Sequence, residues 1–204
     1  MLELILVRHG QTSANAAGLL QGRLDLSLND LGRAQATRVA RVLAPMVSDG
    51  ARVICSPLRR AQETAQAISP EACVDPAWIE LDYGDLDGTP LSDVQREVWD
   101  RWRSDEHFAP AGGESHHVLQ HRVSAACDQL VAHDADGVSD ITEERLVVVS
   151  HVSPIKAAVA WAIGAPLHVV WRMHLDQASI TRIRIAGGGA VLLGFNNTGH
   201  LITQ

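Results

Sequence analysis

The stretch LELILVRHG, Leu2 to Gly10, sets the fold of this chain. Its first six residues form a short apolar run rich in branched side chains, which predicts a buried β-strand. A similar run, RLVVV at residues 145–149, is followed directly by Ser150 and His151. Each of the two predicted strands therefore ends at a histidine, and the first of these is His9.

Patterns typical of helices and of further strands occupy much of the remaining chain. Helices are predicted after Asn29-Asp30 and over Leu58 to Ile68, Leu91 to Trp102, Ser115 to Ala132 and Pro154 to Ile163. In the first of these helices, the residues expected to share one face are Leu31, Ala34, Val39, Val42 and Leu43. Further strands are predicted over Val53 to Cys55, Ile180 to Ile185 and Val191 to Phe195, the last two forming a hairpin around Gly187-Gly188-Gly189.

The alternation of strands and helices predicts an α/β fold, a three-layer α/β/α sandwich around a mostly parallel sheet. With 204 residues, 46% of them hydrophobic, the chain can bury a sizeable core. No stretch reads as a linker, so residues 1–204 are predicted to form a single domain. The acidic, polar stretch around Asp134 to Thr142 is expected to be a loop.

The composition narrows the classes of partner. The formal net charge is −7 and no long basic run occurs, so a nucleic-acid partner is not expected. No stretch approaches the ~20 apolar residues that a membrane helix needs, and the N-terminus lacks the basic region of a signal peptide. The three cysteines, Cys55, Cys73 and Cys127, form neither a CxxC pair nor an evident disulfide framework. Reduced thiols and a cytoplasmic location are therefore expected.

The two histidines are expected at the functional edge of the sheet. In open α/β sheets, ligand sites form at the carboxyl ends of the strands. The predicted strand over residues 53–55 leads into Arg59 and Arg60. Guanidinium groups bind phosphate in a bidentate fork, so an acidic protein can still hold a phosphoryl group where a few arginines converge.

Four blocks of the sequence resemble a known family. LVRHGQTSAN at Leu6 to Asn15 resembles the signature of the histidine phosphatase superfamily, the phosphoglycerate-mutase-like enzymes. Three further blocks resemble that family's segments in the same order: SPLRRAQETA at 56–65, IELDYGDLDG at 79–88 and VVVSHVSPIKA at 147–157. Weaker similarity lies in QGRLDLSLNDLGRAQA at 21–36 and GGES at 112–115. Because the blocks occur in order, the chain is identified as a member of this family.

The resemblance implies a catalytic role for five residues. His9 would be the nucleophile that attacks phosphorus and forms a covalent phosphohistidine. Arg8, Arg60 and His151 would hold the non-bridging oxygens and stabilise charge in the transition state. Glu80 would protonate the departing alkoxide and then help to activate water.

The resemblance also implies a set of substrate-binding positions, namely Arg8, Asn15, Gln21, Gly22, Arg60, His151 and Val152. Asn15, Gln21 and Gly22 would line the pocket near the phosphate or the leaving group. Val152 stands where the family often has glycine. Its backbone N–H could still face the phosphate, but a β-branched residue limits the conformations of this turn.

These roles predict a phosphomonoester hydrolase that acts on small phosphorylated metabolites of the sugar phosphate or phosphoglycerate type. It is expected to need no cofactor or metal and to be a monomer or a homodimer. The alternative is a phosphoglycerate mutase or a related phosphosugar mutase, which uses the same catalytic set. Dedicated mutases of the family tend to carry a lysine- and arginine-rich insertion, whereas residues 89–112 are short and contain no lysine. A binding protein with a degenerate site is a third reading, but all core site residues are present.

Other constellations predict less. His117 and His121 are spaced i, i+4, as a metal pair would be, but no third ligand is evident. Cys55 lies five residues before Arg60, one position short of the C-x5-R loop of cysteine-dependent phosphatases, and is expected in the core. The five tryptophans are expected in the core or at the pocket mouth. If Glu80 is not the proton donor, the next candidates are Asp82 and Glu114.

Overall fold

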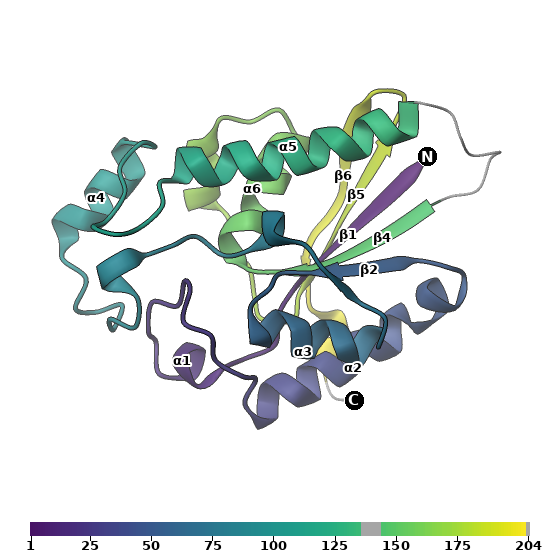
Figure 1. Cartoon of the computed structure of the whole chain (residues 1–204), viewed down its shortest axis with the longest axis horizontal. Helices are drawn as coiled ribbons and strands as arrows, with labels where there is room; N and C mark the ends of the chain where they lie inside the picture. The colour runs from purple at the N-terminus through teal and green to yellow at the C-terminus, as the bar shows by residue number, and fades with distance from the viewer. Residues whose placement is uncertain (136–143, 203–204) are drawn as a thin grey trace.

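The computed structural model describes residues 1–135 and 144–202, which form a six-stranded mixed sheet between two layers of helices (Figure 1). The strand order is β3-β2-β4-β1-β5-β6. The strands are β1 (Leu2–Arg8), β2 (Arg52–Cys55), β3 (Cys73–Val74), β4 (Glu144–Ser150), β5 (Ile180–Ala186) and β6 (Gly189–Asn197). The first four run parallel, and β5 and β6 form an antiparallel hairpin at one edge. The mostly parallel sheet and the hairpin are confirmed. The loop expected around 134–142 lies outside the described residues, apart from the end of the preceding helix.

The helices cover both faces of this sheet (Figure 1). They are α1 (Ser13–Ala16), α2 (Asp30–Ser48), α3 (Arg59–Ile68), α4 (Arg96–Ser104), α5 (His116–Ala135) and α6 (Val152–Ala162). Side chains alternate between the faces of a strand, so Leu4 and Leu6 of β1 pack with α5 and α6. Ile5 and Val7 pack with α2 and α3 on the other face. The predicted three-layer sandwich is therefore confirmed.

The buried face of α2 is only partly the expected one: Val39 and Leu43 are buried as predicted, whereas the other three residues are exposed. Leu31 and Val42 are 52% and 46% exposed, and Ala34 is exposed as well. The buried positions of the helix are Gly32, Ala36, Val39 and Leu43. Gly32 explains the rotation, since a Cβ at this position would lie 2.1 Å from the backbone oxygen of Gln11. The start of the helix packs backbone against backbone, and Leu31, next to Gly32, turns away from the core.

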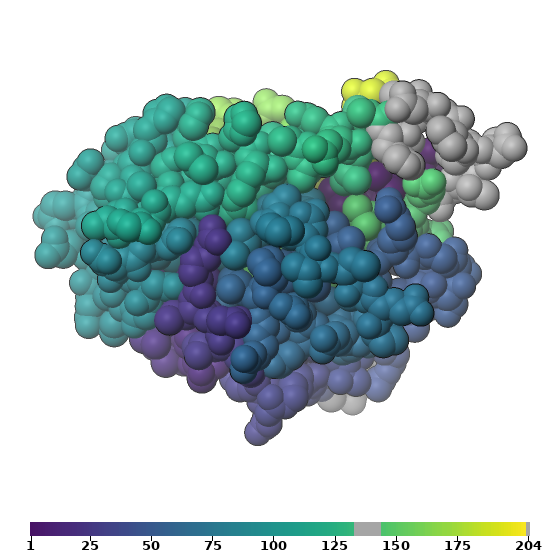
Figure 2. Space-filling view, viewed as in Figure 1, coloured from purple at the N-terminus to yellow at the C-terminus, as the bar shows by residue number. Residues whose placement is uncertain are grey.

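Helix α4 begins later than its sequence pattern indicates. The prediction placed its start at Leu91, but residues 91–94 form a turn and the helix begins at Arg96. The N–H of Leu91 donates to the carbonyl of Gly18, which ties this segment to another part of the chain. The parallel strands point their carboxyl ends toward the end of the molecule where α4 lies (Figure 1). In the space-filling view, α4 and the segment after it form that end of the surface (Figure 2).

Short elements that the sequence did not indicate complete the fold. These are α1, the two-residue strand β3 and 3-10 turns at 76–78, 84–86, 167–172 and 199–201. None of the helices in the described part of the chain is long and apolar enough to cross a membrane.

Candidate active site

The two predicted histidines meet at adjacent strand ends. Strands β1 and β4 pair in parallel, with Arg8 opposite Ser150, so the residue that follows each strand is a histidine. The ring centroids of His9 and His151 are 5.0 Å apart. The two side chains are 3% and 0% exposed.

One guanidinium lies between the two rings. The Nε of Arg60 is 3.2 Å from Nε2 of His9 and 3.2 Å from Nδ1 of His151, and donates to both. Its two terminal nitrogens donate to the carbonyls of Leu24 and Gly22 at 2.6 and 2.7 Å. Arg60 is fully buried, whereas the neighbouring Arg59 is exposed, so only the second arginine of this pair enters the site.

Both imidazoles are neutral near pH 7. Burial, followed by the charges of Arg60 and nearby groups, lowers the pKa of His9 and of His151 well below 6.5. The other nitrogen of His9, Nδ1, donates to the carbonyl of Gly10 at 2.7 Å. This bond assigns the proton to Nδ1 and leaves Nε2 unprotonated, with its lone pair directed at the N–H of Arg60. On His151, Nε2 lies 2.7 Å from the hydroxyl of Ser56, which fixes that ring in the same way.

Arg8 supplies a second buried guanidinium. One of its terminal nitrogens donates to the carbonyl of Leu175 at 2.5 Å. Its Nε is buried and has no hydrogen-bond partner among the described residues. Burial lowers the pKa of Arg8 to about 10, a shift that the carboxylates of Glu80 and Asp176 oppose, so the group stays charged at neutral pH. A buried donor without a partner is costly, so this one is suited to an anionic ligand.

Glu80 is held at the N-terminus of α6. Its carboxylate is 4% exposed and accepts from the backbone N–H groups of Leu81, Val152 and Ser153 at 2.8, 3.1 and 3.2 Å. The N–H of Val152, expected to face a phosphate, thus donates to this carboxylate in the structure. The carbonyl of Glu80 also accepts from Arg122 at 3.3 Å, which fixes the segment from behind. Unpaired N–H groups at a helix N-terminus stabilise such an anion.

Helix α1 and the segment after it carry the three remaining predicted positions. Thr12 is the N-cap of α1, and Asn15 completes a capping box with it, its side-chain oxygen accepting from the N–H of Thr12 at 3.1 Å. Gln21 accepts from the hydroxyl of Thr12 at 2.7 Å, and its amide nitrogen is buried with no partner among the described residues. Gly22 contributes its carbonyl to Arg60 at 2.7 Å. A Cβ at Gly22 would lie 2.5 Å from the oxygen of Leu81, so only glycine fits this close contact.

Several residues that hold this arrangement were not predicted. Asp87 accepts from the N–H groups of Gly22 and Leu24, both at 2.7 Å, and so shapes the loop that receives Arg60. The hydroxyl of Thr64 accepts from the N–H of Gly10 at 3.2 Å. Thr64 and Asp87 lie within the quoted blocks, as Ser56 does, which was the available signal. Arg122 lies outside every block, so only the fold reveals it.

The other candidate proton donors, Asp82 and Glu114, and the candidate thiol of Cys55 form contacts of their own. Glu114 forms an ion pair with Arg122 at 2.9 Å, and Asp82 accepts from the N–H of Gly84 at 2.9 Å. Cys55 is 2% exposed, and burial raises the pKa of its thiol to about 11, so it is the core residue that was expected.

A pocket opens beside Glu80, where the first turn of α6 faces α4. Val152 and Ser153 form part of its wall, and its cavity volume is about 80 Å³. Trp99, Trp102 and Trp171 also line it, whereas Trp78 lies in the core at 1% exposed. The expectation that the tryptophans lie in the core or at the pocket mouth is confirmed for these four.

Comparison with known proteins agrees with this geometry. The family model of the histidine phosphatase superfamily (branch 1) matches residues 4–198. The bifunctional protein Rv2228c of Mycobacterium tuberculosis is 34% identical over 97% of this chain, which spans about half, 54%, of that relative. The glucosyl-3-phosphoglycerate phosphatase of Mycolicibacterium vanbaalenii is 34% identical over 90% of the chain and 84% of its own length. The structure of phosphoserine phosphatase from Entamoeba histolytica superposes with a TM-score of 0.85 at 25% identity, covering 99% of this chain and 100% of that one.

Proposed function

The chain belongs to the histidine phosphatase superfamily, and from that premise we propose that it hydrolyses small phosphomonoesters through a phosphohistidine on His9, without a metal. One observation carries this mechanism. The nucleophilic nitrogen of His9 is unprotonated and buried, and it faces a guanidinium that also contacts His151. A neutral imidazole beside fixed positive charge is suited to attack a phosphate dianion.

The first step forms the covalent intermediate. The lone pair on Nε2 of His9 attacks phosphorus, and the bond from phosphorus to the ester oxygen breaks. The carbonyl of Gly10 accepts from Nδ1 and stabilises the charge that the ring gains. Arg8, Arg60 and His151 hold the three non-bridging oxygens, so that the attacking nitrogen and the leaving oxygen lie in line on opposite sides of phosphorus.

Glu80 moves the proton in both steps. In its protonated form it gives a proton to the departing alkoxide, so that an alcohol leaves. In the second step its carboxylate takes a proton from the water that attacks the phosphohistidine, which releases inorganic phosphate and restores both residues. The N–H groups of Val152 and Ser153 hold the carboxyl group at the start of α6, directly after His151 in the chain.

Transfer to water, rather than to a second hydroxyl of the substrate, is the preferred reading. The arginines of the 89–112 segment lie on the exposed surface of α4, where Arg96 and Arg103 each pair with Asp100. They do not form the basic insertion typical of dedicated mutases in the family. The relatives that bear phosphatase names support a substrate of the phosphoglycerate or sugar phosphate class.

A panel of phosphomonoesters assayed for phosphate release tests this function, with a mutase assay run alongside on the phosphoglycerates. We expect phosphate release together with a phosphoryl group that is trapped on His9 by rapid quenching. Isomerised substrate without phosphate release would favour the mutase. Absence of any turnover on the whole panel would favour a binding protein.

A further inference from the structure

The pocket beside Glu80 is lined by an amine, that of Lys156, for which no described residue supplies a counter-ion. Lys156 lies on α6, one turn beyond the Val152–Ser153 pair whose N–H groups hold Glu80, and it lines the pocket with them. No described residue forms an ion pair or hydrogen bond with this amine. It is half-buried, and burial lowers its pKa, although the nearby charge of Glu80 opposes the shift. An amine in such a position gains most when an anion joins it.

The other walls of the pocket are aromatic and partly unsatisfied. The ring of Trp99 lies 5.3 Å from that of Trp102 and 6.3 Å from that of Trp171. His116, 8% exposed, packs at a tilt against Trp171 with the ring centroids 5.2 Å apart, and its Nδ1 has no partner in the described part of the chain. Flat apolar walls with isolated polar atoms are typical of a site for a ring that carries hydroxyl groups.

We propose that this pocket binds the alcohol portion of the substrate, and that this portion carries a carboxylate that pairs with Lys156 and a ring that packs on the tryptophans. The proposal rests on the phosphatase function proposed above. A single amine neutralises one unit of charge, which matches a carboxylate better than a second phosphate dianion. One helical turn, about 5 Å, separates Lys156 from the N–H groups that hold Glu80. A carboxylate a few bonds from the ester oxygen spans that distance.

A matched pair of substrates tests the charge. 3-Phosphoglycerate carries a carboxylate, and glycerol 3-phosphate has the same carbon skeleton without it. In Lys156→Met, we expect KM for 3-phosphoglycerate to rise about 10- to 100-fold while KM for glycerol 3-phosphate stays within about twofold. Lys156→Arg should restore most of the preference because it keeps the charge.

The outcomes separate this proposal from the phosphatase function itself. Equal losses on both esters in Lys156→Met would mean that Lys156 only supports the fold, and the proposal would fail. A wild-type enzyme that hydrolyses both esters with no preference for the carboxylate would also overturn it. No phosphate release from either ester, or from the wider panel, would instead overturn the proposed function.

The ring is tested with Trp99→Ala. We expect this variant to lose affinity for phenyl phosphate about tenfold and to keep its affinity for glycerol 3-phosphate, which has no ring. Equal affinity of the variant and the wild type for phenyl phosphate would contradict the aromatic part of the proposal.

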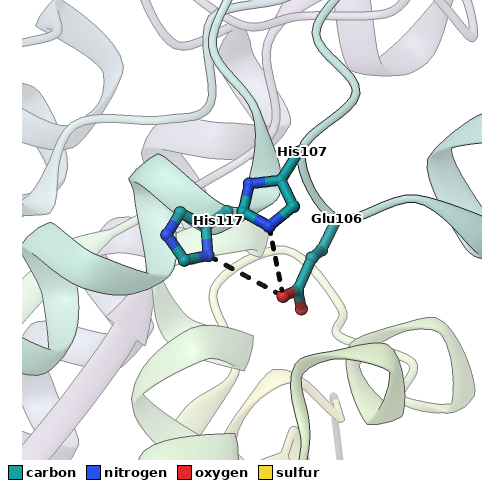
Figure 3. Close-up of side chains that lie close together, drawn as sticks. All are labelled: Glu106, His107 and His117. Atoms are coloured by element: carbon teal, nitrogen blue, oxygen red, sulfur yellow. Dashed lines mark ion pairs between the residues drawn. The ribbon is translucent and has the colours of Figure 1, made fainter.

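A separate cluster on the surface carries a second inference. Glu106 and His107, which follow α4, and His117, in the first turn of α5, point their side chains toward one another (Figure 3). A carboxylate oxygen of Glu106 lies 3.7 Å from Nε2 of His107 and 3.8 Å from Nδ1 of His117. The three side chains are 52%, 66% and 50% exposed. The N–H of His117 also donates to the carbonyl of Glu106 at 2.9 Å, which keeps the two segments together.

We infer that this cluster binds a divalent transition metal such as Zn²⁺. Two imidazoles and one carboxylate are ligands that zinc prefers, at about 2.0–2.2 Å each. Ligand atoms in a tetrahedral zinc site lie roughly 3.4 Å apart, so small rotations of exposed side chains suffice here. The sequence pointed to His117 and His121, but the partners that the fold supplies are Glu106 and His107.

The bound ion would tie the segment after α4 to the start of α5. Phe108, next to His107, packs 6.0 Å from Trp102, which lines the pocket beside Glu80. We therefore expect zinc to stabilise this end of the molecule and to leave the phosphoryl chemistry unchanged.

Calorimetric titration of chelator-treated protein with Zn²⁺ tests the site. We expect one ion to bind with a dissociation constant in the micromolar range, and His107→Ala and His117→Ala each to weaken it more than tenfold. His121→Ala is the matched control, because His121 is exposed one turn further along the same helix. Unchanged affinity in His117→Ala, or an equal loss in His121→Ala, would overturn the inference.

Discussion

The carboxyl edge of the sheet, where the parallel strands end, and the α4 end of the molecule differ in how their polar side chains are buried and paired. At the edge, His9, Arg60 and His151 are at most 3% exposed, and each of these three side chains has a fixed hydrogen-bond partner. At the α4 end, aromatic rings and unpaired polar groups surround an open pocket, and the nearby His107 is 66% exposed. The comparison teaches that the proposed chemistry depends on preorganised buried contacts, while selectivity depends on a more open surface.

The largest loss of activity is expected from a substitution at the carboxyl edge of the sheet. His9→Ala should abolish turnover on every ester, because positioning alone cannot replace the nucleophile. Steady-state rates on the substrate panel provide the measurement. The control is Cys55→Ala, which removes the buried thiol at the end of β2 and should keep the activity. A His9→Ala enzyme with more than about a tenth of the wild-type rate would contradict the covalent mechanism.

The next largest effect separates the proton donor from the nucleophile. Glu80→Gln should lower the rate on alkyl esters by about 10²–10⁴-fold, because alkoxides leave poorly without a proton. A nitrophenyl ester, whose leaving group needs little protonation, should lose much less in its first step. Single-turnover kinetics on both ester types measure the ratio.

Glu114→Gln is the matched control for that ratio. Its carboxylate pairs with Arg122 rather than facing the histidines. The control should slow both ester types alike, if at all. Equal losses on both esters in Glu80→Gln would show that Glu80 only shapes the pocket.

Adding a single methyl group at Gly22 should lower the activity by a smaller amount. In Gly22→Ala the new Cβ would collide with the oxygen of Leu81 and displace the carbonyl that receives Arg60. We expect kcat/KM to fall about 10- to 100-fold and the free energy of unfolding to fall by about 1–3 kcal/mol. Gly189→Ala is the control, since nothing lies within 4 Å of its new Cβ. Equal behaviour of the two variants would show that the loop adapts freely.

Acid should destabilise the α4 end through His116. Burial lowers the folded-state pKa of this residue from 6.5 to about 4, so below pH 6.5 the unfolded chain takes up the proton first. Stability is present above pH 6.5 and is lost as the pH falls toward 4, at about 1.4 kcal/mol per pH unit. The pKa values of His9 and His151 are lowered too, so they act in the same direction.

Denaturant unfolding at pH 6.5 and pH 5 isolates that contribution. Between these two values, His116→Gln should lose about 2 kcal/mol less stability than the wild type. His168→Gln, at an exposed position, is the control and should follow the wild type. Identical acid sensitivity of His116→Gln and wild type would exclude His116 as a source.

The smallest expected effect is that of a chelator on activity. EDTA should leave kcat/KM within about twofold, since Arg8, Arg60 and the two histidines meet the charge of the phosphate in the proposed mechanism. Activity that is lost with EDTA and restored by a divalent metal would place a metal in the catalytic step. Removal of zinc from His107 and His117 should not lower the activity, because that cluster lies at the α4 end and not among the phosphate-binding side chains.

Local sequence patterns predict the fold class and the site residues at the carboxyl ends of the parallel strands. Apolar runs predict β1 and β4, and since parallel strands end at the same edge, His9 and His151 were expected at one edge of the sheet, where the pairing of β1 with β4 then makes them neighbours. The ordered blocks added Arg60 and Glu80 to that edge. These residues follow local patterns, so a linear reading finds them.

Only the tertiary structure decided the rest, because those features depend on contacts between segments far apart in the chain. The close approach of Gly32 to Gln11 rotates α2, and no periodicity encodes such a contact. The amine of Lys156 becomes a candidate ligand only when α6 faces the tryptophans of α4 and of the 167–172 turn. His117 gains Glu106 and His107 as neighbours through a loop whose path is set by packing. Spacing along the chain fixes which residues share an element, whereas packing fixes which elements meet.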